Sequence, residues 1–312
     1  MDKKLKKGLV IKSTGSRYKV SDESGNIIDC VIKGKFRVKG IRTTNPVAAG
    51  DYVYFEPSDN DATGVITDIE ERNNYIIRKA SKLSSESQIL AANIDQLILL
   101  ASIKEPVTHT EFIDRVLVTA EAYQIPVKII FNKSDIYSQE DIEKRDYLIS
   151  VYRKAGYESF SVSLLDDNDR QRIADMVKNR VSLLVGNSGV GKSTLINRVE
   201  PSCNIKTAEV SDYHRMGKHT TTFAEMHALS EGGYIIDTPG IKGFGLIDID
   251  KEEIYHLFPE IFRASKECKY YNCLHFNEPG CGVKKHLEEG KIELFRYRSY
   301  INIFSDNDSR YR

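Results

Sequence analysis

The chain contains no tryptophan, only five cysteines and no surplus of either charge, because its 45 lysines and arginines balance its 45 aspartates and glutamates. It also lacks a long hydrophobic run, since apolar stretches such as LILLA at 97–101 are far too short to cross a bilayer. The first residues, MDKKLKKGLVIKS, carry positive charge without the apolar stretch of a signal peptide. We therefore expect a cytoplasmic protein that makes no use of a membrane.

The 312 residues exceed one average domain, so two or three folded units are expected. Hydrophobic residues make up 40% of the chain and charged residues 29%, which is typical of a globular protein and not of a disordered one. Positive charge gathers at the N-terminal end, where residues 1–42 hold twelve lysines or arginines against four acids, a local excess of eight. Such a field can attract a polyanion, although a charged run is also typical of a solvated face.

Residues 8–70 contain short β-rich segments separated by Gly, Asn, Asp or Pro, which predict a five-stranded closed barrel of the OB type. Barrels of this type commonly bind oligonucleotides, and the basic stretch KGKFRVKGIR at 33–42 would lie on or beside that surface. Tyr18, Phe36 and Tyr52 interleave with the basic residues and can stack on bases. This favours RNA binding over a barrel that only packs on the next domain.

The polar, serine-rich segment 72–95 is predicted to be a linker. From residue 94 onward, apolar strands alternate with helical patterns, which predicts a parallel sheet covered by helices. In the helix that follows Pro106, apolar residues from Phe112 to Tyr123 share one face, which covers the sheet. Asp114 is predicted to point away from that face.

The strongest chemical signal is GNSGVGKS at 186–193, which fits the phosphate-loop pattern Gly-x4-Gly-Lys-Ser between a predicted strand and a predicted helix. Its glycines let backbone N–H groups turn toward phosphates, and the helix N-terminus adds positive potential. Lys192 is predicted to reach the β and γ phosphates, and the Ser193 hydroxyl to coordinate Mg²⁺.

Two more motifs complete a guanine-nucleotide site. In YIIDTPG at 234–240, the Asp237 carboxylate can hold Mg²⁺ through water and the Gly240 N–H can sense the γ phosphate. In VKIIFNKSD at 127–135, Asp135 can accept hydrogen bonds from guanine N1–H and N2, donors that adenine does not offer there. Asn132 can bond the other edge of the base, Lys133 can cover its ring, and SVS at 161–163 can offer a backbone donor to O6. The predicted nucleotide contacts are Asn132, Lys133, Ser134, Asp135, Gly186, Asn187, Ser188, Gly189, Val190, Gly191, Lys192, Ser193, Thr194, Asp237 and Gly240.

The order of these motifs is unusual, because the base-recognition segment precedes the phosphate loop. Binding requires only that the loops converge at one end of the sheet, whatever the order in which the chain visits its strands. The sequence therefore predicts a circularly permuted GTPase domain, cut just before the strand IDQLILLASI at 94–103. Domain termini often lie close together, which makes such rewiring physically tolerable.

Three of the five cysteines fall in one short C-terminal stretch. Cys268, Cys273, His275 and Cys281 lie within fourteen positions, and three thiolates with one imidazole suit a closed tetrahedral Zn²⁺ site. A chance cluster of core cysteines is the alternative. A module of about sixty residues gains stability from a metal, and a cytosolic setting disfavours disulfides.

The hydrolytic machinery is less well marked, because Ile241 stands after DTPG where Ras-like enzymes place a water-positioning glutamine. Slow intrinsic turnover is therefore expected. The segment MGKHTTT at 216–222 occupies the place of a switch loop, and Thr221 is the preferred Mg²⁺ ligand over Thr220 and Thr222. His219 is the leading candidate to orient the attacking water, although a loop histidine is often a solvated bystander.

The motif order, the segments NKSD, GNSGVGKST, KHTTT and DTPG, the barrel and the C-terminal cysteines together resemble the RsgA (YjeQ) family of circularly permuted, small-ribosomal-subunit-dependent GTPases. The resemblance covers nearly the whole chain. It implies a bacterial factor of late small-subunit maturation that hydrolyses GTP when bound to the subunit and its rRNA, with His219 as a catalytic residue and the same four zinc ligands. Alternatives are a permuted GTPase acting on the large subunit or another RNA, and a P-loop kinase of a small metabolite.

The expected fold is α/β: a circularly permuted P-loop GTPase domain with an N-terminal OB-like β-barrel and a small C-terminal zinc-binding, mostly helical domain. The expected boundaries are 1–75 for an RNA-binding barrel, 82–245 for the GTPase domain and 249–312 for the zinc domain. We expect a monomer that uses GTP or GDP, Mg²⁺ and one Zn²⁺, with His219, Lys192 and Thr221 as the catalytic residues.

Overall fold

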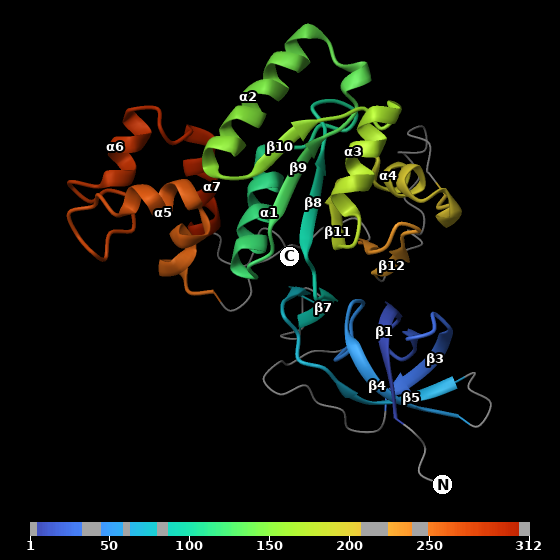
Figure 1. The fold of residues 1–312 in the computed structure, drawn as a ribbon. Helices are drawn as coiled ribbons and strands as arrows, with labels where there is room; N and C mark the ends of the chain where they lie inside the picture. Colours follow the sequence, from blue (N-terminus) through green and yellow to red (C-terminus); the bar gives the residue numbers. More distant parts are fainter. Residues whose placement is uncertain are drawn as a thin grey trace, which may run out of the picture.

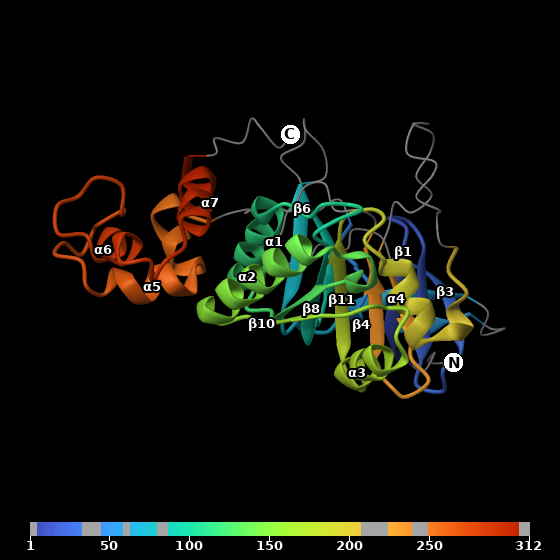
Figure 2. The ribbon, with the colours of Figure 1, turned by 90° about the horizontal axis from the view of Figure 1, so that it is seen from above.

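The computed structural model describes residues 5–32, 45–58, 63–79, 87–206, 224–238 and 249–305. The described chain forms three parts in a row (Figures 1 and 2). A β-barrel lies at one end, a helix-covered sheet in the middle and a small helical domain at the other end. No helix among the described residues is long and apolar enough to cross a membrane.

The N-terminal part is a closed barrel. Its strand β1 pairs with both β2 and β4, β2 pairs with β3, and β5 joins β3 to β4. Side chains alternate between the barrel interior and solvent, and Val10 and Phe55 are among those that fill the core. Tyr18 lies in the same core and is 1% exposed, so the prediction that it stacks on bases is wrong. The predicted five-stranded barrel is thus confirmed, with strands β1 Lys6–Ser13, β2 Tyr18–Asp22, β3 Ile27–Ile32, β4 Tyr52–Pro57 and β5 Thr63–Ile69.

The segment 72–95 is not the linker that its polar composition predicted. Its described residues include two antiparallel strands, β6 Tyr75–Lys79 and β7 Ser87–Ala92. Ile76 and Leu90 enter the core beneath the central sheet, which overrides the local serine-rich signal. The backbone also touches the barrel closely, because a Cβ added at Gly50 would lie 2.0 Å from the carbonyl oxygen of Ala92.

The middle part is built on a parallel sheet in the order β10-β9-β8-β11-β13, with β12 antiparallel at its edge. β8 is buried along its whole length, as a strand covered on both faces should be. The chain moves outward from β8 to β10, then returns to place β11 on the other side of β8 (Figure 1). The strands are β8 Gln96–Ala101, β9 Val127–Phe131, β10 Glu158–Ser161, β11 Val181–Gly186, β12 Glu225–Ala228 and β13 Tyr234–Asp237.

Helices cover both faces of this sheet. α1 and α2 contribute Leu117 and Tyr152 to the core on one face, while α3 and α4 contribute Ile173 and Leu195 to the core on the other. α2 starts at a capping box formed by Ser138 and Asp141. The helices are α1 Thr110–Ala122, α2 Gln139–Ala155, α3 Asp167–Val177 and α4 Lys192–Val199, with short 3-10 turns η1 Ser134–Ile136 and η2 Pro201–Cys203.

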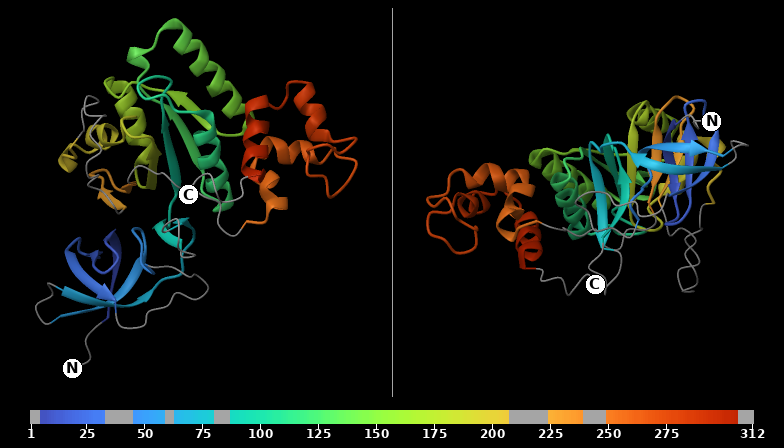
Figure 3. Two further views of the ribbon diagram at one scale, coloured as in Figure 1. Left: turned by 180° about the vertical axis from the view of Figure 1, so that it is seen from behind. Right: turned by 90° about the horizontal axis from the view of Figure 1, so that it is seen from below.

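The central sheet continues directly into the barrel. β12 pairs with β13 on one side and with barrel strand β1 on the other, where Lys12 lies opposite Glu225. Among the described residues, eleven strands therefore form one hydrogen-bonded sheet (Figure 3). The barrel is therefore hydrogen-bonded to β12, the neighbour of β13. Strand β13 ends at Asp237, the residue predicted to hold Mg²⁺ through water.

The C-terminal part is helical and packs beside α1 and α2 (Figures 1 and 2). Phe258 and Tyr300 lie at its centre, and Val118 of α1 joins the same core. Its described elements are the 3-10 helix η4 Lys251–Leu257 and the helices α5 Pro259–Ser265, α6 Gly282–Glu288 and α7 Leu294–Ser305.

Asp114, which helical spacing predicts to point away from the apolar face of α1, is fully buried. Arg296 of α7, itself 1% exposed, donates to the Asp114 carboxylate at 2.7 Å and also pairs with Glu260 of α5 at 2.6 Å. The Tyr152 hydroxyl donates a further hydrogen bond to Asp114 at 3.0 Å. A buried charge needs such partners. The outward face of α1 is thus an internal junction with the C-terminal domain.

Candidate nucleotide site and metal centre

The predicted phosphate loop connects β11 to α4. Gly189 and Gly191 have φ values of 78° and 109°, in the left-handed region that favours glycine. A Cβ at Gly191 would lie 2.5 Å from the side-chain nitrogen of Asn132. The Lys192 ammonium donates to the carbonyls of Gly186 and Asn187 at 2.8 and 3.0 Å, so it lies within the loop. Ser188, Val190, Ser193 and Thr194 complete this strand-loop-helix turn.

Asn132, at the end of β9, ties the base-recognition segment to the phosphate loop. It is 3% exposed, and its side-chain nitrogen donates to the Val190 carbonyl at 2.9 Å. Its side-chain oxygen accepts from the Leu164 N–H at 3.3 Å. Two motifs separated by about fifty residues in the sequence therefore meet at the carboxyl ends of β9 and β11, the parallel strands on either side of β8, where open α/β sheets bind ligands.

Asp135 is oriented by a residue that motif reasoning did not single out. The Ser163 hydroxyl donates to the Asp135 carboxylate at 2.7 Å, and the Ser163 N–H donates to Asp169 at the start of α3 at 2.8 Å. The Leu165 N–H donates to the Ser163 hydroxyl at 3.3 Å. The segment 161–163, predicted to offer a donor to the base, thus also fixes the position of Asp135.

Lys133 has φ 68°, which turns the chain sharply after Asn132. Its ammonium donates to the Glu105 carbonyl in the loop after β8, and Ser134 begins the turn η1. The Tyr137 hydroxyl donates to the Asn132 carbonyl and accepts from the Ile103 N–H at 2.9 Å. The loop after β8, which contains no recognised motif, therefore supports the base-recognition segment.

Asp237 ends β13 and is largely shielded from solvent. Burial raises the pKa of Asp237, while the nearby Lys192 and His227 oppose that rise. Burial also lowers the pKa of Lys192, and Asp237 opposes this. Within the described part of the chain, Asp237 Oδ1 has no hydrogen-bond partner. A buried carboxylate oxygen of this kind and the Ser193 hydroxyl are the hard oxygen donors that Mg²⁺ prefers, so the residues fit that ion.

Several predicted residues lie outside the described ranges. They are Gly240, Ile241, His219 and the three threonines Thr220, Thr221 and Thr222. The basic residues Lys33, Lys35 and Arg37 and the aromatic Phe36 are also outside these ranges.

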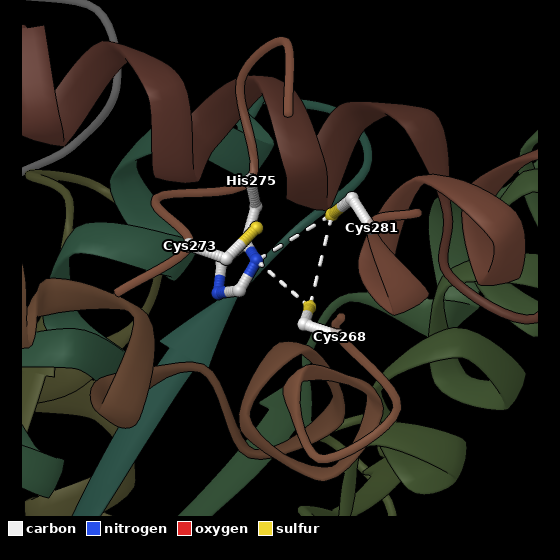
Figure 4. A group of neighbouring side chains, drawn as sticks. All are labelled: Cys268, Cys273, His275 and Cys281. Atoms are coloured by element: carbon white, nitrogen blue, oxygen red, sulfur yellow. Dashed lines mark hydrogen bonds between the residues drawn. The ribbon is translucent and has the colours of Figure 1, made fainter. Parts of the chain in front are cut away.

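The four predicted zinc ligands come together in the C-terminal domain (Figure 4). Their ligand atoms all lie within 4.8 Å of one another, and three of the four residues are buried. Cys268 Sγ and Cys281 Sγ are 3.9 Å apart, and each lies 3.5 Å from His275 Nδ1. A tetrahedral ion with Zn–S bonds near 2.3 Å would separate two sulfurs by about 3.8 Å. The side chains therefore fit a closed zinc site, bound through Nδ1.

Neighbouring groups hold the ligand loop in place. The Glu278 carboxylate accepts the backbone N–H groups of Leu274, Phe276 and Asn277 at 2.8 to 3.0 Å. The Tyr297 and Tyr300 hydroxyls of α7 donate to the carbonyls of His275 and Leu274, each at 2.7 Å. Burial raises the pKa of Cys273 to about 12, so a cation is needed to stabilise its thiolate. α7 thus links the metal cluster to the junction at Arg296.

Comparison with known proteins decides the family. A family model described as RsgA GTPase matches residues 69–247, and one described as RsgA N-terminal domain matches residues 7–66. The chain belongs to the RsgA GTPase family. It is therefore a GTPase, and GTP, GDP and Mg²⁺ are the ligands that the family implies.

Full-length relatives support the same family. A protein of Phocaeicola vulgatus is 54% identical over 98% of this chain and 99% of its own length, and one of Christiangramia forsetii is 50% identical over 98% of each. Both are named small ribosomal subunit biogenesis GTPase RsgA.

Two crystal structures share the fold. YjeQ from Thermotoga maritima is 31% identical, with a TM-score of 0.77 over 96% of this chain and 98% of that one. YloQ, described as a circularly permuted GTPase, is 30% identical, with a TM-score of 0.71 over 97% and 94% of the two chains. The predicted permuted GTPase fold is thus confirmed.

Proposed function

We propose that this chain binds the small ribosomal subunit, acts late in its assembly, and hydrolyses GTP to GDP and phosphate upon docking. The observation that supports the chemistry is the convergence of the base and phosphate segments, joined by Asn132, at one end of the sheet. The name shared by the full-length relatives supports the ribosomal target. Such a role implies a cytoplasmic factor, and we propose that it acts as a monomer with the domain boundaries 1–75, 82–245 and 249–312.

In this proposal Asp135 selects guanine by accepting hydrogen bonds from N1–H and the N2 amino group, and Ser163 holds the carboxylate in place. Lys133 covers the ring, and the second hydrogen of the Asn132 amide remains for the base. The phosphate loop binds the phosphates through its backbone N–H groups and Lys192.

Replacing Asp135 by Asn tests the base assignment. Because the amide cannot accept from both guanine donors but suits the xanthine edge, we expect nucleotide preference to shift from GTP toward xanthosine triphosphate by roughly a hundredfold or more. Competition binding measures this shift, and Asp146→Asn on the exposed side of α2 serves as the matched control. A parent protein that bound ATP as well as GTP would contradict the assignment and favour a metabolite kinase.

Catalysis is assigned to Lys192, His219 and Thr221, with Mg²⁺ held by Ser193 and Thr221 and, through water, by Asp237. The ion would neutralise charge that develops on the phosphate oxygens. His219 would orient the attacking water, and the Gly240 N–H would sense the γ phosphate. Since this histidine acts on the transition state, His219→Ala should lower turnover on the subunit and leave GTP affinity nearly intact. Unchanged turnover would reject this role.

The C-terminal cluster is proposed to hold one Zn²⁺ per chain through Cys268, Cys273, His275 and Cys281. This ion is structural, because four protein ligands close its coordination shell. The basic N-terminal barrel is proposed to supply the main contacts to rRNA phosphates, including Lys33, Lys35 and Arg37.

A further inference from the structure

A row of charged side chains runs from the barrel to the nucleotide site. Strands β1, β12 and β13 lie side by side, and their register places Lys12 opposite Glu225 and Glu225 opposite Asp237. Directly opposed residues of antiparallel strands project from the same face of a sheet. Lys192 of the phosphate loop is the cationic neighbour of Asp237. The row therefore runs Lys12, Glu225, Asp237 and Lys192, with the two acids in the middle.

The outer pair of this row is a formed ion pair. Lys12 Nζ lies 2.7 Å from Glu225 Oε2, and the two side chains are 33% and 36% exposed. The inner acid, Asp237, lies directly opposite Glu225 in the antiparallel pairing of β12 with β13. Glu225 therefore acts on Asp237 across one inter-strand spacing, and Lys12 offsets Glu225 from the barrel side.

We propose that Lys12 and Glu225 are positioning residues through which the barrel sets the Mg²⁺ affinity of the nucleotide site. The inference rests on the proposed nucleotide site and adds a route by which the barrel acts on it. With Lys12 in place, the Lys12–Glu225 pair has no net charge. Asp237 is then the negative group available to Mg²⁺. Loss of Lys12 leaves an uncompensated Glu225 beside Asp237, which makes the site more negative. Loss of Glu225 leaves an uncompensated lysine, which makes the site less negative.

The two single changes should therefore have opposite effects, and their combination should cancel. We expect Lys12→Met to lower the midpoint Mg²⁺ concentration at which GDP release slows, and the midpoint should fall by roughly twofold to fivefold. This factor corresponds to the free energy of a partly exposed ion pair. Glu225→Gln should raise it by a similar factor. The double variant, which restores a neutral pair, should lie within about twofold of the parent. A purely structural role for the ion pair predicts instead that both single changes act in the same direction.

The readout is the dissociation rate of N-methylanthraniloyl-GDP from the full-length protein, measured across a Mg²⁺ titration at one fixed pH. This rate reports ion binding independently of GTP hydrolysis. Lys128→Met is the matched control, because Lys128 forms the same kind of cross-strand pair with Glu158 on β10, at the other edge of the central sheet. The control should leave the Mg²⁺ midpoint unchanged. Added KCl should shrink the shifts in the single variants, because exposed charges are screened.

Opposite shifts that cancel in the double variant would support the proposal. Shifts in the same direction, an absence of shift, or shifts as large as these in Lys128→Met would overturn it while leaving the proposed function intact. If the parent failed to bind the GDP analogue, the proposed function would fall, and this inference with it.

Discussion

The GTPase core meets its two neighbours in different ways. Toward the C-terminal domain, the junction is a buried cluster in which Arg296 contacts both Asp114 and Glu260 and is 1% exposed. Toward the barrel, the junction is a strand pairing with the partly exposed pair Lys12 and Glu225, and Leu9 and Ala49 on the barrel side are buried in the core of the central sheet. Breaking a buried charge cluster is costly, whereas an exposed pair contributes little to stability. The charged contacts with the C-terminal domain are thus buried, whereas the charged pair between β1 and β12 is partly exposed and contributes little.

The largest effect on the C-terminal domain and its junction should come from loss of the metal. Cys273→Ser removes a ligand, so we expect zinc to be released and the C-terminal domain to loosen, because structural zinc contributes folding free energy directly. Helix α7 should loosen with it, since its tyrosines hold the ligand loop. Metal analysis and hydrogen exchange measure both changes, while GDP binding should survive. Purified parent protein without zinc would contradict the account.

A smaller but still large effect is expected at the buried junction. Arg296→Met leaves Asp114 and Glu260 buried without their cation, which should lower the free energy of unfolding by about 3–5 kcal/mol. Urea denaturation measures the change, and Arg298→Met, exposed on the same helix, is the matched control. A loss below about 1 kcal/mol would show that the junction is weaker than its geometry indicates.

The smallest effect is expected at the barrel junction. Lys12→Met should change the free energy of unfolding by less than about 1 kcal/mol, because both partners of the pair are about one third exposed. The same urea denaturation provides the measurement. A loss as large as that of Arg296→Met would remove the distinction between the two junctions.

The sequence predicted those features that local patterns encode. The phosphate loop has a fixed spacing between a strand and a helix, and the four clustered ligands in the C-terminal domain lie close together in the chain. The barrel and the permuted sheet follow from alternating apolar segments and from the motif order. Each of these signals lies within a short window of residues.

The features that sequence reasoning missed depend on distant partners. The burial of Asp114 leaves no signal in the sequence, because its partner Arg296 is 182 residues away. The serines of segment 72–95 predict a linker and conceal Ile76 and Leu90, which pack under the central sheet. Glu225 lies in no recognisable motif, because its proposed role depends on its strand partners Lys12 and Asp237. Long-range pairing of this kind leaves no periodic trace in a single sequence.

Activation by the small ribosomal subunit can be measured as GTP turnover with purified small or large subunits over a range of salt. We expect slow basal turnover and strong stimulation by small subunits that falls steeply with salt, because phosphate contacts release counterions. The triple change Lys33→Glu, Lys35→Glu and Arg37→Glu should weaken this stimulation and leave basal turnover unchanged. Equal stimulation by large subunits, or no stimulation at all, would contradict the claim.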